Sequence, residues 1–412
     1  MSQAGSYVLG TFSTTKDAEI KRLQAQADLF WEKELRCYRL YGLADGMAVV
    51  ECGSGPGYVL DKILAAFPGC ACTGVEIDQE FVEVHRQRLA AQGMNRCTVV
   101  QNSILSTGLP DSSFDFAITR LVLEHLPNPL DAVREVWRIL KPGGKAVFID
   151  NDFEFHLTTY PEIPPLKMLY DAYCRSMSAA GGNPKIGRQL PTILREAGFE
   201  HIDLEILSAH SETAGDRAFL KSEGVGISTQ LVKDGYLNSA MLDAIATGWH
   251  DMLEKENHVF FRQVFCAVGQ KSLTGKAALK ESSAAASRSD AQAKEKDASR
   301  HPSAGGQNSL EDLIVQQVAA SLQTAAEALR KDVPLTDIGF DSLAAVELKS
   351  RIKTELGVDL PIADFFMGQT LDGIIRQVQG IVHDKPQESS PGSGPTRKDA
   401  PGSGSGWDEG VL

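Results

Sequence analysis

The sequence predicts two folded units of different class: an open, mostly parallel α/β sheet with helices on both faces, followed by a small all-helical bundle. Short apolar runs alternate with helix-period segments between residues 46 and 150, which is typical of repeated βα units. From residue 310 to 378 the apolar residues recur at helical spacing without a strand signal. Residues 271–308, between the two blocks, lack aromatic side chains, so we expect a disordered linker there.

Composition and charge narrow the class of protein. A chain of 412 residues suits two domains with linkers. The net charge of −13 argues against a basic nucleic-acid surface. No apolar run reaches the roughly 20 residues of a membrane-spanning helix, and the first 15 residues have no signal-peptide core. The seven cysteines lack the spacing of a disulfide framework or a zinc site. We expect a cytoplasmic protein with no metal, nucleic-acid or membrane partner.

Strand and helix signals follow one another in the first block. The expected strands, each a short apolar run suited to a buried parallel strand, are Gly46–Glu51, Cys72–Ile77, Cys97–Gln101, Phe114–Thr119 and Lys145–Asp150. The helices expected between them are Gly57–Phe67, Phe81–Gln92 and Pro129–Leu140. Proline and two glycines at 141–144 should end the last of these helices.

An amphipathic helix is expected near the N-terminus. Residues 21–41 carry large apolar side chains at roughly helical spacing. Such a helix either forms a lid over a pocket at the sheet or packs as ordinary core, and the pattern leaves both open. We assign residues 1–42 to N-terminal lid helices.

A glycine-rich turn follows the first strand. Gly53, Gly55 and Gly57 allow the backbone to approach a ligand closely, because glycine has no Cβ. Dinucleotide enzymes use a related turn, but Pro56 interrupts this one and the pyrophosphate arrangement is missing. The second strand ends at Glu76, whose carboxylate is placed to accept both ribose hydroxyls. These features favour S-adenosylmethionine over NAD.

Four segments in order resemble the class I S-adenosylmethionine-dependent methyltransferases. They read VVECGSGPG, TGVEID, LPDSSFDFAITRLVLEHLPNP and VWRILKPGGKAVFID. The resemblance covers Lys21 to Lys271 and implies an enzyme with a Rossmann-like fold and a mostly parallel, seven-stranded sheet. We place this methyltransferase domain at residues 1–270.

The resemblance also implies cofactor-binding residues. They are Glu51, Gly53, Gly55, Gly57, Glu76, Ile77 and Ser103. Glu51 would lie near the amino group of the methionine moiety, Glu76 would hold the ribose, and Ile77 would lie against adenine. Many members carry an aspartate at the position of Ser103, which contacts the adenine amino group. Arg120, at the end of the fourth strand, would contact the cofactor or substrate, or else form a salt bridge that stabilises the fold.

A hydroxyl acceptor requires a general base, and histidine is the usual choice near neutral pH. Ligands of open α/β sheets bind at the carboxyl ends of the strands. If the chain stays extended after the fifth strand, Asp152, Glu154 and His156 share one side. We therefore favour His156 as base, oriented by either acid, with a surface histidine as the alternative reading. His125, within LEHLP, is a second candidate, which we expect to be structural or close to the cofactor.

A second motif lies in the helical block. Residues 339–343 read GFDSL and open a helix with Ser342 in its first turn, where a phosphodiester would lie beside free amides at the positive helix end. Asp341 and Ser342 are also ordinary helix caps. Leu310–Val378 resembles acyl carrier proteins, nearer the polyketide-synthase type. The resemblance implies a four-helix domain at residues 309–383, with 4′-phosphopantetheine added to Ser342 by a phosphopantetheinyl transferase. It also implies acidic docking contacts at Asp341 and Glu347.

Together the motifs predict a methyltransferase–carrier pair from a polyketide or mixed polyketide–peptide assembly line. We expect O-methylation of an acyl intermediate tethered to the carrier, with neighbouring synthase modules as partners. The alternatives are C-methylation at the α-carbon of that chain, methylation of a free small molecule, and a degenerate methyltransferase fold that serves as a spacer. Residues 384–412 are expected to be a disordered tail or linker.

Overall fold

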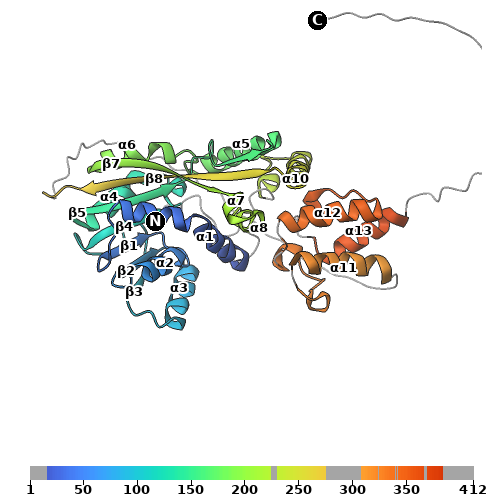
Figure 1. Ribbon diagram of the computed structural model, residues 1–412, viewed down its shortest axis with the longest axis horizontal. Helices are drawn as coiled ribbons and strands as arrows, with labels where there is room; N and C mark the ends of the chain where they lie inside the picture. Colours follow the sequence, from blue (N-terminus) through green and yellow to red (C-terminus); the bar gives the residue numbers. More distant parts are fainter. Residues whose placement is uncertain are drawn as a thin grey trace, which may run out of the picture.

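The computed structural model describes residues 16–223, 230–274 and 308–383, except 323, 339, 341 and 366–368. Most of the predicted linker and the whole predicted tail therefore lie outside the described residues. The first unit is a mixed sheet flanked by helices, and the second is a helical bundle (Figure 1). None of the described helices combines the length and apolarity that crossing a bilayer demands.

The sheet of the first unit has eight strands in the order β3-β2-β1-β4-β5-β8-β6, with β7 also paired to β8. The strands are β1 (Ala48–Cys52), β2 (Ala71–Glu76), β3 (Cys97–Gln101), β4 (Phe114–Arg120), β5 (Leu140–Asp150), β6 (Leu157–Tyr160), β7 (Phe199–His210) and β8 (Val259–Lys271). Strands β1 to β5 pair in parallel, whereas β8 is antiparallel to its neighbours. The predicted Rossmann-like, mostly parallel fold is confirmed.

Strand β6 lies in line with β5 along the same side of β8, so it does not add a new column to the sheet. β5 pairs with residues 265–270 of β8, and β6 pairs with residues 259–262 of the same strand. β7 pairs along residues 261–271 and so occupies the opposite edge of β8. The expected seven columns are present, and one of them is broken after Asp150.

Residues 141–144, which were predicted to end a helix, lie in a strand. Helix α4 (Pro129–Ile139) ends where expected, but KPGG lies within β5. The pairing of β5 with β4 shifts register between Phe114 and Phe116. Proline and glycine thus produce an irregularity at the start of the strand, as they commonly do in sheets.

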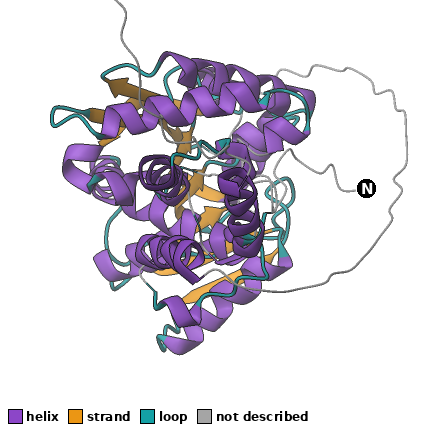
Figure 2. Ribbon diagram, turned by 90° about the vertical axis from the view of Figure 1, so that its right-hand side faces the viewer, coloured by secondary structure: helices purple, strands orange, loops and turns teal. Residues whose placement is uncertain are grey.

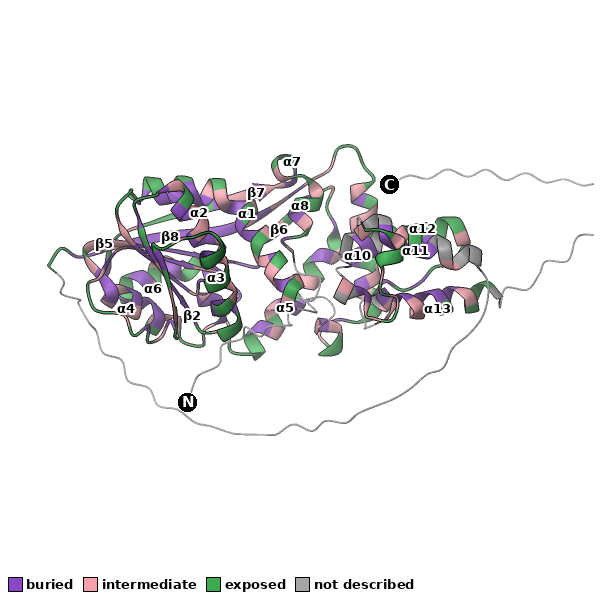
Figure 3. Cartoon of the chain, turned by 90° about the horizontal axis from the view of Figure 1, so that it is seen from below, coloured by how far each residue is buried: buried purple, intermediate pink, exposed green. Residues whose placement is uncertain are grey.

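Helices cover both faces of the sheet (Figure 2). Besides α4, they are α1 (Lys16–Leu40), α2 (Tyr58–Ala66), α3 (Gln79–Ala91), α5 (Pro164–Ala179), α6 (Leu190–Glu196), α7 (Ser211–Ala214), α8 (Asp216–Leu220) and α10 (Ser239–Leu253). Alternate strand residues face opposite helix layers: Val49 packs in the cluster that contains α1 and α2, and Val50 in the one that contains α4 and α6. This alternation is the period-2 geometry of a strand buried on both faces, and the central strands β1, β4, β5 and β8 are largely buried (Figure 3).

The second unit contains α11 (Asn308–Leu322), α12 (Ser342–Leu356) and α13 (Leu371–His383). A short 3-10 turn, η5 (Ile362–Phe365), stands where the expected fourth helix would be. Phe340 and Phe365 stack with ring centroids 6.4 Å apart, and the predicted α13 stripe through Ile374 and Val378 is buried. The prediction of an all-helical bundle is confirmed. Its described residues form three α-helices and three short 3-10 turns, which are η3 (Ala326–Ala328), η4 (Leu335–Ile338) and η5.

Candidate active site

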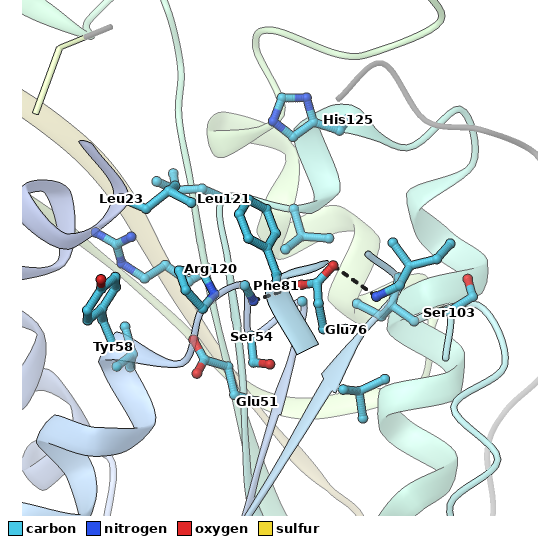
Figure 4. A pocket seen from close by; sticks show the side chains of 18 of the residues that line it. Leu23, Glu51, Ser54, Tyr58, Glu76, Phe81, Ser103, Arg120, Leu121 and His125 are labelled. Carbon is cyan, nitrogen blue, oxygen red and sulfur yellow. Dashed lines mark hydrogen bonds between the residues drawn. The ribbon is translucent and has the colours of Figure 1, made fainter. Parts of the chain in front are cut away.

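A cavity of about 360 Å³ opens at the carboxyl ends of β1, β2 and β4. Leu23 and Gln26 of α1 line one side, and the turn after β1 lines another. Open α/β sheets bind ligands at this edge. Figure 4 shows acidic side chains from neighbouring strands converging on this space.

Two glycines of the turn after β1 are required by sterics. Gly53 and Gly57 have φ of +80° and +84°, which only glycine adopts readily. A Cβ on Gly53 would collide with Val122, and one on Gly57 would collide with the His85 ring. Gly53 and Gly55 line the cavity, whereas Gly57 is not among its lining residues in the described chain.

Glu76 holds this turn in place. Its carboxylate accepts hydrogen bonds from the backbone N–H of Gly55 at 2.7 Å and from those of Ile77 and Asp78 at 2.9 Å each. Burial raises the pKa of Glu76, and the three backbone donors oppose that rise. The carboxylate therefore lines the cavity in a fixed orientation, where it can meet hydroxyl groups of a ligand.

Glu51, at the end of β1, is buried but has fewer hydrogen bonds than Glu76. It is 2% exposed, and its Oε2 has no hydrogen-bond partner among the described residues. Burial raises its pKa well above the usual range, although nearby Arg120 opposes this. Ser54 Oγ, also in the cavity lining, is likewise unpartnered within the described chain. The cavity thus offers an acid and a hydroxyl suited to a ligand with a cationic amino group, as the ammonium of S-adenosylmethionine would be.

Arg120 forms the salt bridge that was one of its predicted alternatives. Its Nε donates to Glu34 Oε1 of α1 at 2.7 Å, and its NH2 donates to the carbonyl oxygen of Gln26 at 3.1 Å. The side chain nevertheless lines the cavity. Arg120 therefore ties α1 to β4 beside the pocket.

The remaining predicted cofactor residues, Ile77 and Ser103, also line the cavity. Ile77 is 60% exposed, so it offers an apolar surface on which a flat ligand can pack. Ser103 Oγ accepts a hydrogen bond from the N–H of Leu105 at 3.2 Å. Sequence reasoning missed several lining residues, which are Leu23, Gln26, Tyr58, Phe81, Asn102 and Val122. Only the amphipathic character of α1 hinted at the first two.

The expected arrangement around His156 needs correction. After Asp150 the chain leaves the extended conformation and turns at residues 153–156, so the predicted alternation does not hold. Asp152 pairs with Arg188, and Glu154 pairs with Arg188 and Lys185. Neither acid orients His156.

His156 is instead buried in a cluster with two aromatic rings. It stacks on Phe153 at 4.5 Å between ring centroids and lies 5.2 Å from the ring of Tyr170. Its Nδ1 lies 3.2 Å from Asn151 Oδ1, and its Nε2 lies 3.3 Å from Glu223 Oε2. Burial and the charge of Arg262 lower its pKa. His156 is not among the cavity-lining residues of the described chain.

His125 does line the cavity. Its Nε2 lies 3.4 Å from Glu124 Oε1, and Glu124 accepts two hydrogen bonds from Asn151 Nδ2, at 2.8 and 3.0 Å. Because Asn151 also contacts His156, polar contacts connect the two histidines. Burial raises the pKa of Glu124 to about 7 and lowers that of His125 to about 3.

Ser342 is the first residue of α12. This is the position that the motif predicts for a serine carrying a group at a helix N-terminus. Gly339 and Asp341 lie outside the described residues, so the acidic contact expected of Asp341 stays a prediction.

Two protein families match this chain. Residues 50–148 match the family described as a methyltransferase domain, and residues 312–378 match the phosphopantetheine attachment site. An uncharacterized 37.1 kDa protein in transposon TN4556 of Streptomyces fradiae is 32% identical over 156 residues, covering 37% of this chain and 44% of that protein. A demethylmenaquinone methyltransferase of Listeria monocytogenes is 28% identical over 103 residues, 25% of this chain and 40% of the enzyme. The chain thus spans less than half the length of these relatives.

Solved methyltransferase structures are also similar. Phosphoethanolamine N-methyltransferase 2 of Haemonchus contortus is 17% identical with a TM-score of 0.40, and the match covers 60% of this chain and 56% of that one. A putative methyltransferase of Bacillus halodurans is 17% identical with a TM-score of 0.39, covering 58% and 98%. From the two family matches, this chain combines an S-adenosylmethionine-dependent methyltransferase domain with a phosphopantetheine carrier domain.

Proposed function

We propose that this chain methylates an acyl group that its own carrier domain holds through phosphopantetheine on Ser342, as a step of polyketide-type biosynthesis. The observation that carries the proposal is the cavity lined by Glu51, whose Oε2 has no hydrogen-bond partner among the described residues, in the same chain as a phosphopantetheine attachment domain. A tethered acceptor reaches an effective concentration in the millimolar range through a suitable linker. Fusion of the two domains then favours a tethered substrate over a free one.

Residues of the cavity have separate tasks in this proposal. S-adenosylmethionine, when bound, supplies an electrophilic methyl carbon on its sulfonium sulfur. Glu51 would hold the ammonium, Glu76 the ribose hydroxyls, and Ile77 and Ser103 the adenine. Leu23 and Gln26 of α1 cover the cavity and exclude water. Alignment of two reactants supplies up to roughly 7–11 kcal/mol of a barrier, so positioning carries most of the catalysis.

The acceptor proton goes to His125 in our proposal, rather than to the favoured sequence candidate His156. Of the two, only His125 lines the cavity. Burial lowers its pKa to about 3, so its ring is neutral at pH 7 but is a weak base. Glu124, 3.4 Å from its Nε2, would stabilise the charged ring. Oxygen is the first-choice acceptor, and the same base would serve an acidic α-carbon.

The test uses the full chain, converted to the phosphopantetheine form and loaded with a hydroxyl-bearing acyl group. Intact-mass spectrometry after incubation with S-adenosylmethionine should show the gain of one methyl group, and fragmentation locates it on oxygen or carbon. Ser342→Ala should show no gain. His125→Asn should slow the gain about 100-fold, as loss of a general base does, while His156→Asn should retain it if the fold is intact.

Three results would contradict the proposal. Methylation of a free acyl compound but not of the loaded carrier would point to a free metabolite as substrate. Absence of cofactor binding by calorimetry would indicate a degenerate domain acting as a spacer. A loss of rate in His156→Asn equal to that in His125→Asn, with cofactor affinity preserved, would return the base to His156.

A further inference from the structure

The carrier domain packs mainly on α10 of the methyltransferase domain. Leu242 and Ala246 of α10 belong to the same apolar cluster as the carrier core and are only 6% and 9% exposed. α10 contacts both α12 and η5 of the carrier, and α8 contacts α12. Figure 1 shows α8 and α10 on the side of the first unit that faces the carrier helices. The junction is therefore a packed apolar contact.

Asp243 of α10 makes the polar part of this contact. Its Oδ1 accepts a hydrogen bond from the backbone N–H of Ile362 at 2.6 Å and lies 3.5 Å from Lys349 Nζ of α12. The N–H of Ile362 stands at the start of η5, where a short helix leaves its donors without internal partners. One carboxylate thus satisfies a buried amide and a lysine of the carrier together.

A neighbouring pair extends the interface. Ser350 Oγ of α12 lies 3.4 Å from His250 Nε2, about two turns beyond Asp243 along α10. Lys349 is held in position within the carrier by the carbonyl oxygen of Leu360 at 2.7 Å and by Asp359 at 3.2 Å. The lysine is therefore fixed before it meets Asp243, which lowers the entropy lost on docking.

At the Lys349 contact the carrier supplies the cation and the methyltransferase domain supplies the acid. The acidic docking contacts expected of Asp341 and Glu347 stay predictions. A carrier with an acid at the position of Lys349 would place two like charges together, which disfavours the wrong partner. The contact therefore favours a carrier with a base at this position over one with an acid.

The contact with α10 also relates to the position of residue 342, where the phosphopantetheine tether would begin. Position 342 precedes Lys349 by seven residues, which places both on the same face of α12 about 10 Å apart along the helix. The face that meets α10 is thus also the face on which the attachment residue stands. α8, which contacts α12, also contacts α1, whose Leu23 lines the cavity.

We propose that α10 is the carrier-recognition helix of the methyltransferase domain, and that Asp243 selects this chain's own carrier through Lys349 and the Ile362 amide. The docked carrier presents its acyl group for methylation, a step that rests on the function proposed above. Docking itself does not depend on turnover and has its own readout.

The experiment compares Asp243→Lys, Asp243→Asn and the matched control Asp251→Lys, an exposed acid on the same helix, in the full chain. Small-angle X-ray scattering should show a larger radius of gyration for Asp243→Lys than for wild type. Asp243→Asn keeps an acceptor for the amide and should change less, and Asp251→Lys should match wild type. Methylation of the loaded carrier should fall about tenfold or more in Asp243→Lys, because a hydrogen-bonded charge pair is replaced by repulsion.

The outcomes separate docking from function. An unchanged radius of gyration in Asp243→Lys, or an equal increase in Asp251→Lys, overturns the docking site. Faster methylation in Asp243→Lys overturns the productive role of the docked arrangement. If wild type does not methylate its loaded carrier, the proposed function fails, while the scattering comparison still decides whether α10 recognises the carrier.

Discussion

Glu51 and Glu76 lie at the ends of adjacent strands, yet their carboxylates are in opposite states. Glu76 accepts three backbone hydrogen bonds, whereas Glu51 Oε2 is unpartnered within the described chain. A buried polar atom without a partner costs about 1–3 kcal/mol. Apolar runs predict that both acids lie at strand ends, and the family resemblance implies that both bind the cofactor. The sequence cannot predict which one has spare hydrogen-bonding capacity, since that depends on the path of the turn.

Replacing Glu51 by glutamine tests its role at the residue scale. The variant keeps the size of the side chain but loses the charge that would meet an ammonium group. A hydrogen bond to a charged group contributes about 1.5–3 kcal/mol, so the Kd for S-adenosylmethionine should rise roughly 10- to 100-fold in calorimetry. Glu83→Gln, an exposed acid on α3, is the control. Equal affinity in both variants would remove Glu51 from the binding site.

His85 predicts a pH dependence of stability. It is buried against Gly57, neither ring nitrogen has a partner in the described chain, and burial together with Arg88 lowers its pKa to about 4. An unfolded histidine has a pKa near 6.5, so between about pH 6.5 and 4 the unfolded chain binds more protons. The free energy of unfolding should therefore fall as the pH drops through this window.

The measurement is urea unfolding of wild type and His85→Gln at pH 7, 6 and 5. Between pH 7 and 5 the wild type should lose about 2 kcal/mol more than the variant, whatever the variant's stability at pH 7. Parallel pH curves for the two proteins would show that His85 does not titrate as its burial requires.

At the scale of elements, α1 serves as both core and pocket wall, the two roles that its sequence left open. Phe30 and Tyr38 are fully buried, while Leu23 and Gln26 line the cavity. The Glu34–Arg120 pair fixes the helix against β4. The N-terminal helix was therefore predictable from its periodicity, but its attachment to Arg120, 86 positions away, was not.

Breaking that pair should loosen α1. Glu34→Gln leaves Arg120 buried without its counter-charge, which typically costs about 3–5 kcal/mol. We expect faster amide hydrogen exchange across residues 16–40 and weaker cofactor binding. Glu32→Gln, an exposed neighbour on the same helix, should leave both unchanged. Normal exchange in α1 of Glu34→Gln would mean that apolar packing alone holds the helix.

The strands that the sequence predicts and the strands that it misses differ in their pattern of apolar residues. β1 to β5 are mostly continuous apolar runs, the pattern of strands buried on both faces. β7 carries acidic residues at Glu200, Asp203 and Glu205 and is largely exposed, so its apolar signal is weak. The turn at 153–156 then explains one error, because it removes the alternation on which the role of Asp152 and Glu154 depended. The same turn separates β6 from β5.

At the scale of the whole molecule, the two domains follow from motifs, but their contact does not. Asp243 and Ile362 are 119 positions apart, and no local pattern marks either as an interface residue. The net charge of −13 suggests a basic docking surface on a partner protein. In the observed contact, however, the acid Asp243 belongs to the methyltransferase domain and the base Lys349 to the carrier. Interfaces of this kind depend on tertiary placement rather than on sequence period.

The two domains have separate apolar cores that meet at α10, so we expect them to unfold in separate steps. The methyltransferase core and the carrier core are distinct clusters, with Leu242 and Ala246 of α10 contributed to the second. Calorimetric heating should therefore show two transitions. S-adenosylmethionine at 100 times its Kd adds about 2.7 kcal/mol to the domain that binds it, which should raise that transition by roughly 5–10 °C.

The carrier transition should move much less with cofactor, because only the α10 contact transmits the stabilisation. Asp243→Lys should abolish even that small shift while leaving the large one intact, since it disturbs the interface and not the cavity. A single transition that moves as a whole with cofactor would mean that the domains unfold together. In that case α10 would be an integral part of one core.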